Sequence, residues 1–217
     1  MDGTVVAAFG SAADLAGELL RSAAVGERWK EGSAVEGFSV GGLAAHMVGA
    51  TLRLQRVLDE APPEGSPVVT LTGCYGLNRV NDPAELETGM HPLIRADGER
   101  RAAMGQEAVA GKFAAVVSGL LPRLATESDE RLVPVLQPQG AATTLRVYVV
   151  TRIIELLVHS DDLAVSAGRD GFALPREAAD VVMLAFLELA RERAGDLAVM
   201  RAFTRRERQA PDILRVL

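Results

Sequence analysis

The chain has little of several features that mark particular classes of protein. Its single cysteine, Cys74, excludes an intrachain disulfide, so we expect a reducing, cytoplasmic location. Aromatic residues make up only 4% of the sequence, which disfavours a strand-rich sandwich. The first twenty residues lack a basic leader followed by a solid apolar run, so we expect no export signal. No stretch approaches 18 uninterrupted apolar residues, and we expect no membrane partner.

Positive charge is also not in excess. The net charge of −6 and the pI near 5.2 give the chain no overall attraction for a phosphate backbone. Nucleic-acid-binding proteins usually present a basic patch or stripe, whereas the most basic run, at residues 205–208, is interrupted by Glu207. We therefore expect no nucleic-acid partner.

What the sequence does contain favours helices. Hydrophobic residues make up 48% of the 217 residues, which is enough for a continuous core. The bias toward alanine, valine, leucine and arginine favours helices packed through small aliphatic side chains. We predict an all-α fold in a single domain, residues 1–217, in which about 197–217 form a basic C-terminal tail.

Apolar spacing and capping residues predict the individual helices. Ser39 and either Thr143 or Thr144 are plausible N-caps, and Gly168 is a plausible stop. The expected helices are Thr4–Ala24, a segment from Ser39 to about Leu58, Ile94 or later to Ala125, Thr144–Ala167, and about Pro175–Ala194. Short β-like runs at Val68–Leu71 and Leu132–Leu136 add a small irregular or β-containing excursion, and residues 67–93 read as a long loop near a functional site.

The helix expected to end at Ala167 contains most of the candidate functional residues. On a helical wheel nearly all the other positions of this helix are apolar. The polar residues fall on one narrow arc: Tyr148, Thr151, Arg152, Glu155, His159, Asp162 and Ser166. Glu155 and His159 are four residues apart, so both side chains can reach one metal ion. Imidazole nitrogen and carboxylate oxygen are normal zinc ligands, and a catalytic site commonly uses three protein ligands.

His46 is the best candidate for the third ligand. It lies in the middle of an otherwise apolar helix, where an uncompensated imidazole is an awkward core residue. Each half of this set has a simpler interpretation. Glu155 and His159 could form a solvated i, i+4 contact, and His46 could be a hydrogen-bonded core histidine. The pattern is not His-Glu-x-x-His, so no metalloprotease is implied.

Three other residues have two interpretations each. Arg152 could bind a substrate carboxylate, although a structural salt bridge with a neighbouring acid is the commoner role. His91 could approach a substrate or be an exposed loop histidine. Cys74 could be a nucleophile, but no cationic neighbour or helix N-terminus in its sequence context lowers its pKa, which favours an incidental role.

Two motifs resemble the mycothiol-dependent maleylpyruvate isomerase family of the DinB-like superfamily. They are FSVGGLAAHMVGA at residues 38–50 and TRIIELLVHSDDLAVSAG at residues 151–168, and the closing RAFTRRERQAPDILRVL resembles the way such domains end. The resemblance implies a DinB-like four-helix bundle with His46, Glu155 and His159 as metal ligands. It also implies that Asp162 either orients a ligand histidine or contacts a thiol cofactor.

The resemblance carries a functional hypothesis with it. A divalent metal, expected to be zinc, would activate a low-molecular-weight thiol, mycothiol, for transfer to or isomerisation of a small electrophile. Asp162 and Arg152 are then the candidate catalytic residues, and Asp162 is also a candidate cofactor contact. A homodimer is a further expectation from the family. The alternative is a non-catalytic, metal-containing helical module with a binding or regulatory role.

Overall fold

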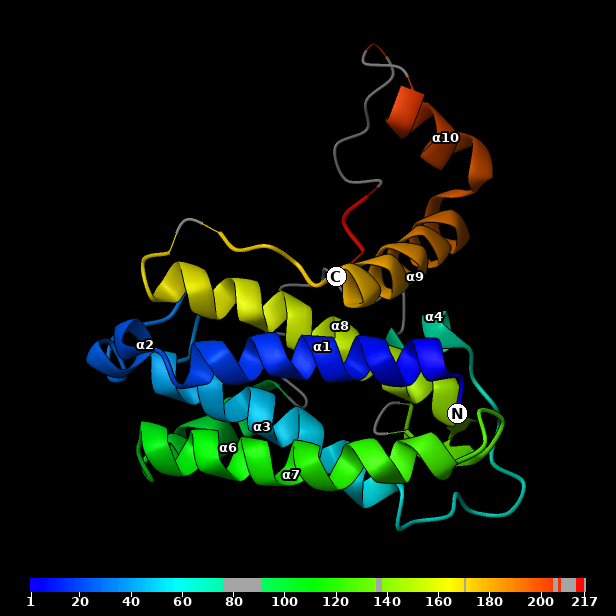
Figure 1. The fold of residues 1–217 in the computed structure, drawn as a ribbon. Helices are drawn as coiled ribbons and strands as arrows, with labels where there is room; N and C mark the ends of the chain where they lie inside the picture. Colours follow the sequence, from blue (N-terminus) through cyan, green and yellow to red (C-terminus); the bar gives the residue numbers. More distant parts are fainter. Residues whose placement is uncertain (76–90, 136–137, 170, 205–206, 208–213, 217) are drawn as a thin grey trace.

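The computed structural model describes residues 1–75, 91–135, 138–169, 171–204, 207 and 214–216, and this part of the chain is mostly helical (Figure 1). The predicted all-α class with a small β excursion is confirmed. The helices are α1 (Gly3–Leu20), α2 (Ala23–Glu27), α3 (Val40–Val57), α4 (Leu71–Tyr75), α6 (His91–Ala102), α7 (Gln106–Thr126), α8 (Leu145–Ser166), α9 (Arg176–Ala194) and α10 (Asp196–Thr204), and the strands are β1 (Leu132–Pro134) and β2 (Ala142–Thr144).

Four long helices form a closed bundle. Helix α1 packs against α7 and α8, and α3 packs against the same two helices from the other side. The largest side chains buried between them come from all four helices, among them Phe9, Phe113, Leu54 and Ile153. Burying a side chain of this size stabilises the fold by about 1.5–3 kcal/mol, so this shared core holds α3 and α8 in a fixed relation.

The remaining helices are added around this bundle. Helix α6 covers α3, and α9 packs on α1 and α8. Helix α10 follows α9 and projects away from the bundle (Figure 1). Helices α1 and α7 have the length and mean hydropathy of membrane-spanning helices, which core helices of a bundle share, and both contribute buried side chains to the bundle core.

The predicted caps of the two helices that matter most are confirmed. Ser39 precedes α3 and its hydroxyl accepts a hydrogen bond from the amide of Gly42 at 2.9 Å. Thr144 precedes α8 and accepts from the amide of Val147 at 3.3 Å. Helix α8 then ends before Gly168, whose φ of +72° suits glycine.

The single helix predicted from Ile94 to Ala125 is wrong, because the chain breaks into α6 and α7. Gly105 lies at the break with φ of +86°, a left-handed conformation that side chains disfavour. The side-chain amide of Gln106 donates to the carbonyls of Leu20 and Ser22, at 2.9 and 2.8 Å. These bonds tie the start of α7 to the end of α1, so the direction of α7 is set by tertiary contacts.

Two other boundaries need correction. The first helix stops at Leu20 rather than Ala24, because Ser22 caps a separate short helix, α2. The predicted tail begins with an ordered helix, α10, stabilised at its start by an ion pair between Arg191 and Asp196 at 2.7 Å. Most of the tail beyond Thr204 lies outside the described residues.

The β excursion is a two-stranded antiparallel sheet. Leu132 pairs with Thr144 and Pro134 pairs with Ala142, which confirms the start of the strand predicted at Leu132–Leu136. The β-like run at Val68–Leu71 supplies only an isolated bridge to Ala142 before α4 begins at Leu71. The bridge from Val68 to β2 therefore ties the chain before α4 to the start of α8. Residues 76–90 of the predicted loop lie outside the described part of the chain.

Helix α6 approaches α3 unusually closely. A Cβ built on Gly98 would lie 2.7 Å from the backbone oxygen of Gly42. The carboxylate of Glu99 accepts hydrogen bonds from the backbone amide and the hydroxyl of Ser39, at 2.7 and 2.9 Å. The small residues at this contact and the two hydrogen bonds from Ser39 to Glu99 fix the start of α3, the helix that contains His46.

Candidate metal site

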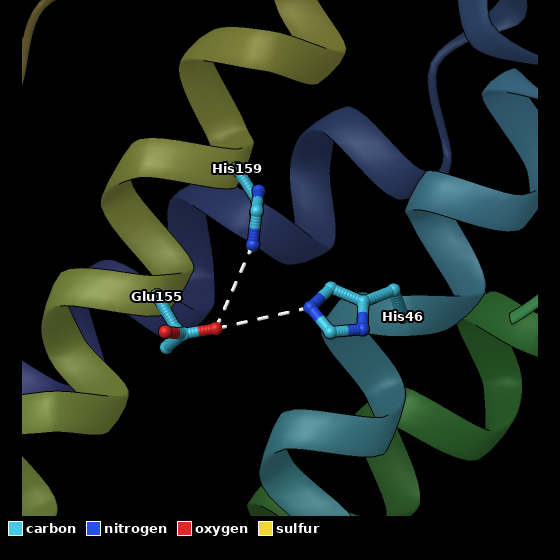
Figure 2. Close-up of side chains that lie close together, drawn as sticks. All are labelled: His46, Glu155 and His159. Carbon is cyan, nitrogen blue, oxygen red and sulfur yellow. Dashed lines mark ion pairs between the residues drawn. The ribbon is translucent and has the colours of Figure 1, made fainter. Parts of the chain in front are cut away.

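Helices α3 and α8 bring three predicted ligands together. The Nε2 atom of His46 lies 3.8 Å from Oε2 of Glu155, and Nε2 of His159 lies 3.6 Å from the same oxygen. Figure 2 shows His46 reaching from α3 toward Glu155 and His159 on α8. The three candidate ligand atoms all lie within 4.8 Å of one another. The two halves of the predicted set, 109 residues apart in sequence, thus meet at one point.

These distances suit a shared metal ion. Two ligands held about 2.1 Å from a tetrahedral zinc ion are roughly 3.4 Å apart, and the two distances from Glu155 to the histidines differ from that value by only a few tenths of an ångström. Two imidazoles and one carboxylate form a donor set that zinc accepts. Among the described residues the cluster has three members, which is the number that leaves a coordination position for another molecule.

Asp162 extends the cluster behind His159. Its Oδ2 atom lies 3.0 Å from Nδ1 of His159, on the side of the ring away from Glu155. A carboxylate in this position holds the proton on Nδ1, so Nε2 is the nitrogen that can donate its lone pair to a metal ion once it has released its own proton. Of the two predicted roles for Asp162, this geometry supports orientation of a ligand histidine.

The charges in the cluster are strongly coupled. Burial alone would raise the pKa of Glu155, but the neighbouring imidazoles of His159 and His46 and the charge of Arg152 hold that pKa well below its usual value. Burial also lowers the pKa of His46. Burial would lower the pKa of His159 too, yet its hydrogen bond to Asp162 and the nearby carboxylate of Glu155 raise it to about 9. The site therefore holds an ionised carboxylate that attracts positive charge.

The cluster forms one wall of a cavity of about 570 Å³, a volume in the usual range for small-molecule sites. Phe38 reinforces the wall, with its ring 5.6 Å from that of His46. The lining combines aromatic and aliphatic side chains with a few polar groups: Val35, Phe38, His46, Arg53, Cys74, Tyr75, His91, Ile94, Val135, Tyr148, Thr151, Arg152, Glu155 and His159.

Most of the predicted polar arc of α8 faces this cavity. Side chains of Glu155 and His159 are only 23% and 19% exposed, so the alternative of a solvated surface pair is wrong. Arg152 lines the cavity too, and its guanidinium lies 5.1 Å from the centre of the Tyr148 ring. The salt bridge expected for Arg152 is not found with any acid among the described residues. Asp162 is not part of the lining.

The two other ambiguous residues are also near the cavity. His91 is exposed, begins α6 and lines the cavity without joining the cluster. Cys74 lines it from α4, and burial raises the pKa of its thiol, which favours the protonated form and disfavours a role as nucleophile. No sequence pattern distinguishes these two positions from ordinary loop residues.

Arg53 and Tyr75 were missed by sequence reasoning. Arg53 follows His46 by seven residues, so both lie on the same face of α3, and this spacing could have identified it. Tyr75 has no such signal, because α4 is only five residues long. Its hydroxyl is 3.5 Å from the backbone oxygen of Thr151. Both residues join the cavity through the packing of separate elements.

A bundle with two histidines and a glutamate at the wall of a small-molecule cavity defines a class of helical protein with a candidate metal centre. The comparison with protein families narrows this class, since residues 10–164 match the model of the mycothiol maleylpyruvate isomerase N-terminal domain. The match covers more than half of the chain, which therefore belongs to this family, and the predicted resemblance is confirmed. No curated protein and no solved structure matches the chain.

Proposed function

We propose that the chain holds a divalent metal, with zinc as the first expectation, through His46, Glu155 and His159, and that it activates a low-molecular-weight thiol for reaction with a small electrophile. The main support for this proposal is that these three side chains lie close together at the wall of a cavity. The chain belongs to a family whose name includes mycothiol, and this supports mycothiol as the thiol.

Each residue of the cluster has a defined task in this proposal. The carboxylate of Glu155 offsets the charge of the ion, while neutral imidazoles of His46 and His159 donate lone pairs. Asp162 holds His159 in the tautomer that binding requires. A metal bound there supplies a Lewis acid that favours the deprotonated, nucleophilic form of a thiol. The apolar walls of the cavity limit access of water to that thiol.

The reaction balances without an added oxidant or reductant. The thiol gives up its proton, its sulfur forms a bond to an electrophilic carbon, and the π electrons of the substrate move toward a conjugated carbonyl oxygen. The proton then returns to the substrate carbon, which completes an addition. In isomerisation the carbon–carbon bond rotates before the carbon is protonated, the sulfur then leaves with its bonding electrons, and the proton returns to the sulfur, so the thiol is regenerated.

The competing function is a binding or regulatory module in which the metal is structural. A structural site usually has four protein ligands, whereas the cluster has three among the described residues and opens on a cavity. These two features favour the catalytic proposal. A reduced thiol cofactor also fits the proposed cytoplasmic location. A homodimer is retained from the family resemblance as an expectation.

Cobalt substitution gives a direct test of thiol activation. Reconstitution with Co²⁺ followed by titration with mycothiol should produce a thiolate-to-cobalt absorption band in wild type and none in His46→Ala. Cys74→Ser is the control, because it removes the protein's own thiol and should leave the band unchanged. If the band is absent from wild type although cobalt is bound, the thiol-activation proposal fails.

A further inference from the structure

The chain contains two tyrosines, Tyr75 and Tyr148, and both line the cavity beside the candidate metal centre. Tyr148 lies on α8 about two helical turns before Glu155, and side chains of a helix tilt toward its N-terminus, away from Glu155. Tyr75 reaches α8 from α4 instead. Its hydroxyl oxygen lies 3.5 Å from the backbone oxygen of Thr151, about one turn before Glu155. The hydroxyl of Tyr75 is therefore the one placed beside the candidate ligands.

This hydroxyl retains most of its capacity to donate a hydrogen bond. A bond between a hydroxyl and an oxygen is normally about 2.7–2.8 Å long, so the contact of 3.5 Å with Thr151 is weak. The backbone oxygen of Thr151 also lies inside α8, where the helical pattern pairs it with the amide of Glu155. A partly buried tyrosine hydroxyl normally has a close partner. The O–H of Tyr75 is thus available to a ligand in the cavity.

Contacts from two directions hold α4, and with it Tyr75, in place. At the start of α4, the hydroxyl of Thr143 donates to the backbone oxygen of Val69 at 2.7 Å. Within α4, the hydroxyl of Thr72 donates to the carboxylate of Glu192 on α9 at 2.6 Å. Helix α4 packs on α9 (Figure 1), which lies beyond the region that matches the family model. The position of the Tyr75 hydroxyl is therefore set before a ligand binds.

The charges around Tyr75 suit a neutral donor. Burial, and to a smaller extent the charge of Glu155, raise the pKa of Tyr75 far above its ordinary value, so the hydroxyl keeps its proton. The positive charge of Arg152 acts on both Tyr75 and Glu155. An oxygen atom that gained negative charge in this part of the cavity would meet an O–H donor and a nearby cation. Donors that are already oriented toward developing charge stabilise a transition state.

We infer that the hydroxyl of Tyr75 donates a hydrogen bond to the oxygen atom of the electrophile that gains negative charge. This inference rests on the proposed function, in which sulfur bonds to a carbon and π electrons move toward a conjugated carbonyl oxygen. Tyr75 keeps its proton throughout, so the step needs no additional acid, oxidant or reductant. Tyr75 is thus a catalytic residue that α4 brings to the site formed by α3 and α8.

4-Nitrophenol tests this donor without any reaction, because its phenolate oxygen has the kind of negative charge that we place beside Tyr75. 4-Nitrotoluene has nearly the same shape and lacks that oxygen. Equilibrium dialysis above the pKa of free 4-nitrophenol measures the affinity of both probes for metal-loaded protein. Wild type should prefer 4-nitrophenolate, and Tyr75→Phe should bind it at least about tenfold more weakly while binding 4-nitrotoluene equally well. No preference in wild type, or equal losses for both probes in Tyr75→Phe, would overturn the inference.

Tyr148→Phe is the matched control. It removes a tyrosine hydroxyl from the same cavity and keeps the aromatic ring under the guanidinium of Arg152. Binding of 4-nitrophenolate should be nearly unchanged in this variant. Far-UV circular dichroism and a melting temperature establish that both variants are folded. Equal losses in Tyr148→Phe and Tyr75→Phe would contradict the assignment to Tyr75.

Binding of the phenolate to a metal must also be separated from the bond to Tyr75. The loss caused by Tyr75→Phe is therefore measured again in His46→Ala, where it should persist. A loss confined to metal-loaded protein would place the phenolate on the metal and overturn the inference. The cobalt–thiol band is measured on the same wild-type samples. A normal band without preference for 4-nitrophenolate defeats this inference alone, while preference without the band defeats the proposed function alone.

Discussion

The Nδ1 atom of His159 lies 3.0 Å from Oδ2 of Asp162, while Nε2 of the same ring lies 3.6 Å from Oε2 of Glu155. The imidazole is thus held between two carboxylates of the same helix, one on each nitrogen. Asp162 can keep the Nδ1 proton in place when a cation binds on the Nε2 side. Asp162 is therefore a positioning residue, which acts through His159.

Removal of Asp162 should weaken metal binding without unfolding the protein. Asp162→Ala is expected to lower zinc affinity by about 10–100-fold, because the ligand histidine loses its outer partner. Competition with a chromogenic chelator measures the change. Asp161→Ala is the matched control, since Asp161 is exposed and next in sequence. Equal zinc affinity in the two variants would remove Asp162 from the account.

Gly98 tests the close approach of α6 to α3. A methyl group there would meet the backbone oxygen of Gly42 at 2.7 Å and the ring of Phe38 at 3.0 Å. We expect Gly98→Ala to lower the free energy of unfolding by about 1–3 kcal/mol, as overpacking does. Urea denaturation at constant m-value measures the change.

Gly111 is the control for that experiment. It lies inside α7 and an added Cβ meets nothing within 4 Å. Gly111→Ala should therefore raise the free energy of unfolding by about 0.5–1 kcal/mol, because alanine restricts the unfolded chain and favours the helix. If both variants shift stability in the same direction, the proposed contact between α3 and α6 is not what makes Gly98 necessary.

Asp2 should make stability depend on pH in acid. Its carboxylate accepts from Arg146 and from the amide of Thr4, both at 2.8 Å, and these bonds lower its pKa from 3.8. A folded-state pKa below the unfolded one gives a stabilisation that is full above the unfolded pKa and lost as pH falls through the folded value.

Comparing the stability of wild type with that of Asp2→Asn tests the direction of this pH dependence. Wild type should be the more stable protein at pH 7, and its advantage in urea midpoint should shrink as pH falls below about 4. Asp14→Asn changes the net charge equally from an exposed position on the same helix. An advantage for wild type that is constant between pH 7 and pH 3 would show that the ion pair contributes nothing.

Local chemistry explains which parts of the fold could be predicted. The bounds of α3 and α8 follow from hydroxyl caps at Ser39 and Thr144 and from the glycine stop at Gly168, all of which act within a few residues. Glu155 and His159 share a face by spacing alone. The sequence therefore predicts the half of the site that lies on one helix.

Features that depend on distant contacts could not be predicted in this way. The predicted helix contains Gly98, Gly111 and Gly119 besides Gly105, and the bonds from Gln106 to the end of α1 favour a break at Gly105. Arg53 faces the cavity because α3 packs against α8, a pairing that periodicity does not reveal. The place of His46 in an apolar helix and the family resemblance both indicate it as a ligand, but only the packing of α3 on α8 brings it to within 3.8 Å of Glu155.

The metal content of purified protein shows directly whether His46, Glu155 and His159 hold one metal ion. Elemental mass spectrometry is applied to untagged wild type and to His46→Ala, Glu155→Ala and His159→Ala, with His91→Ala as the control because His91 lines the same cavity outside the cluster. We expect near-stoichiometric zinc in wild type and His91→Ala and loss of zinc in the other three variants. Equal metal in all five proteins, or none in wild type after reconstitution, would contradict it.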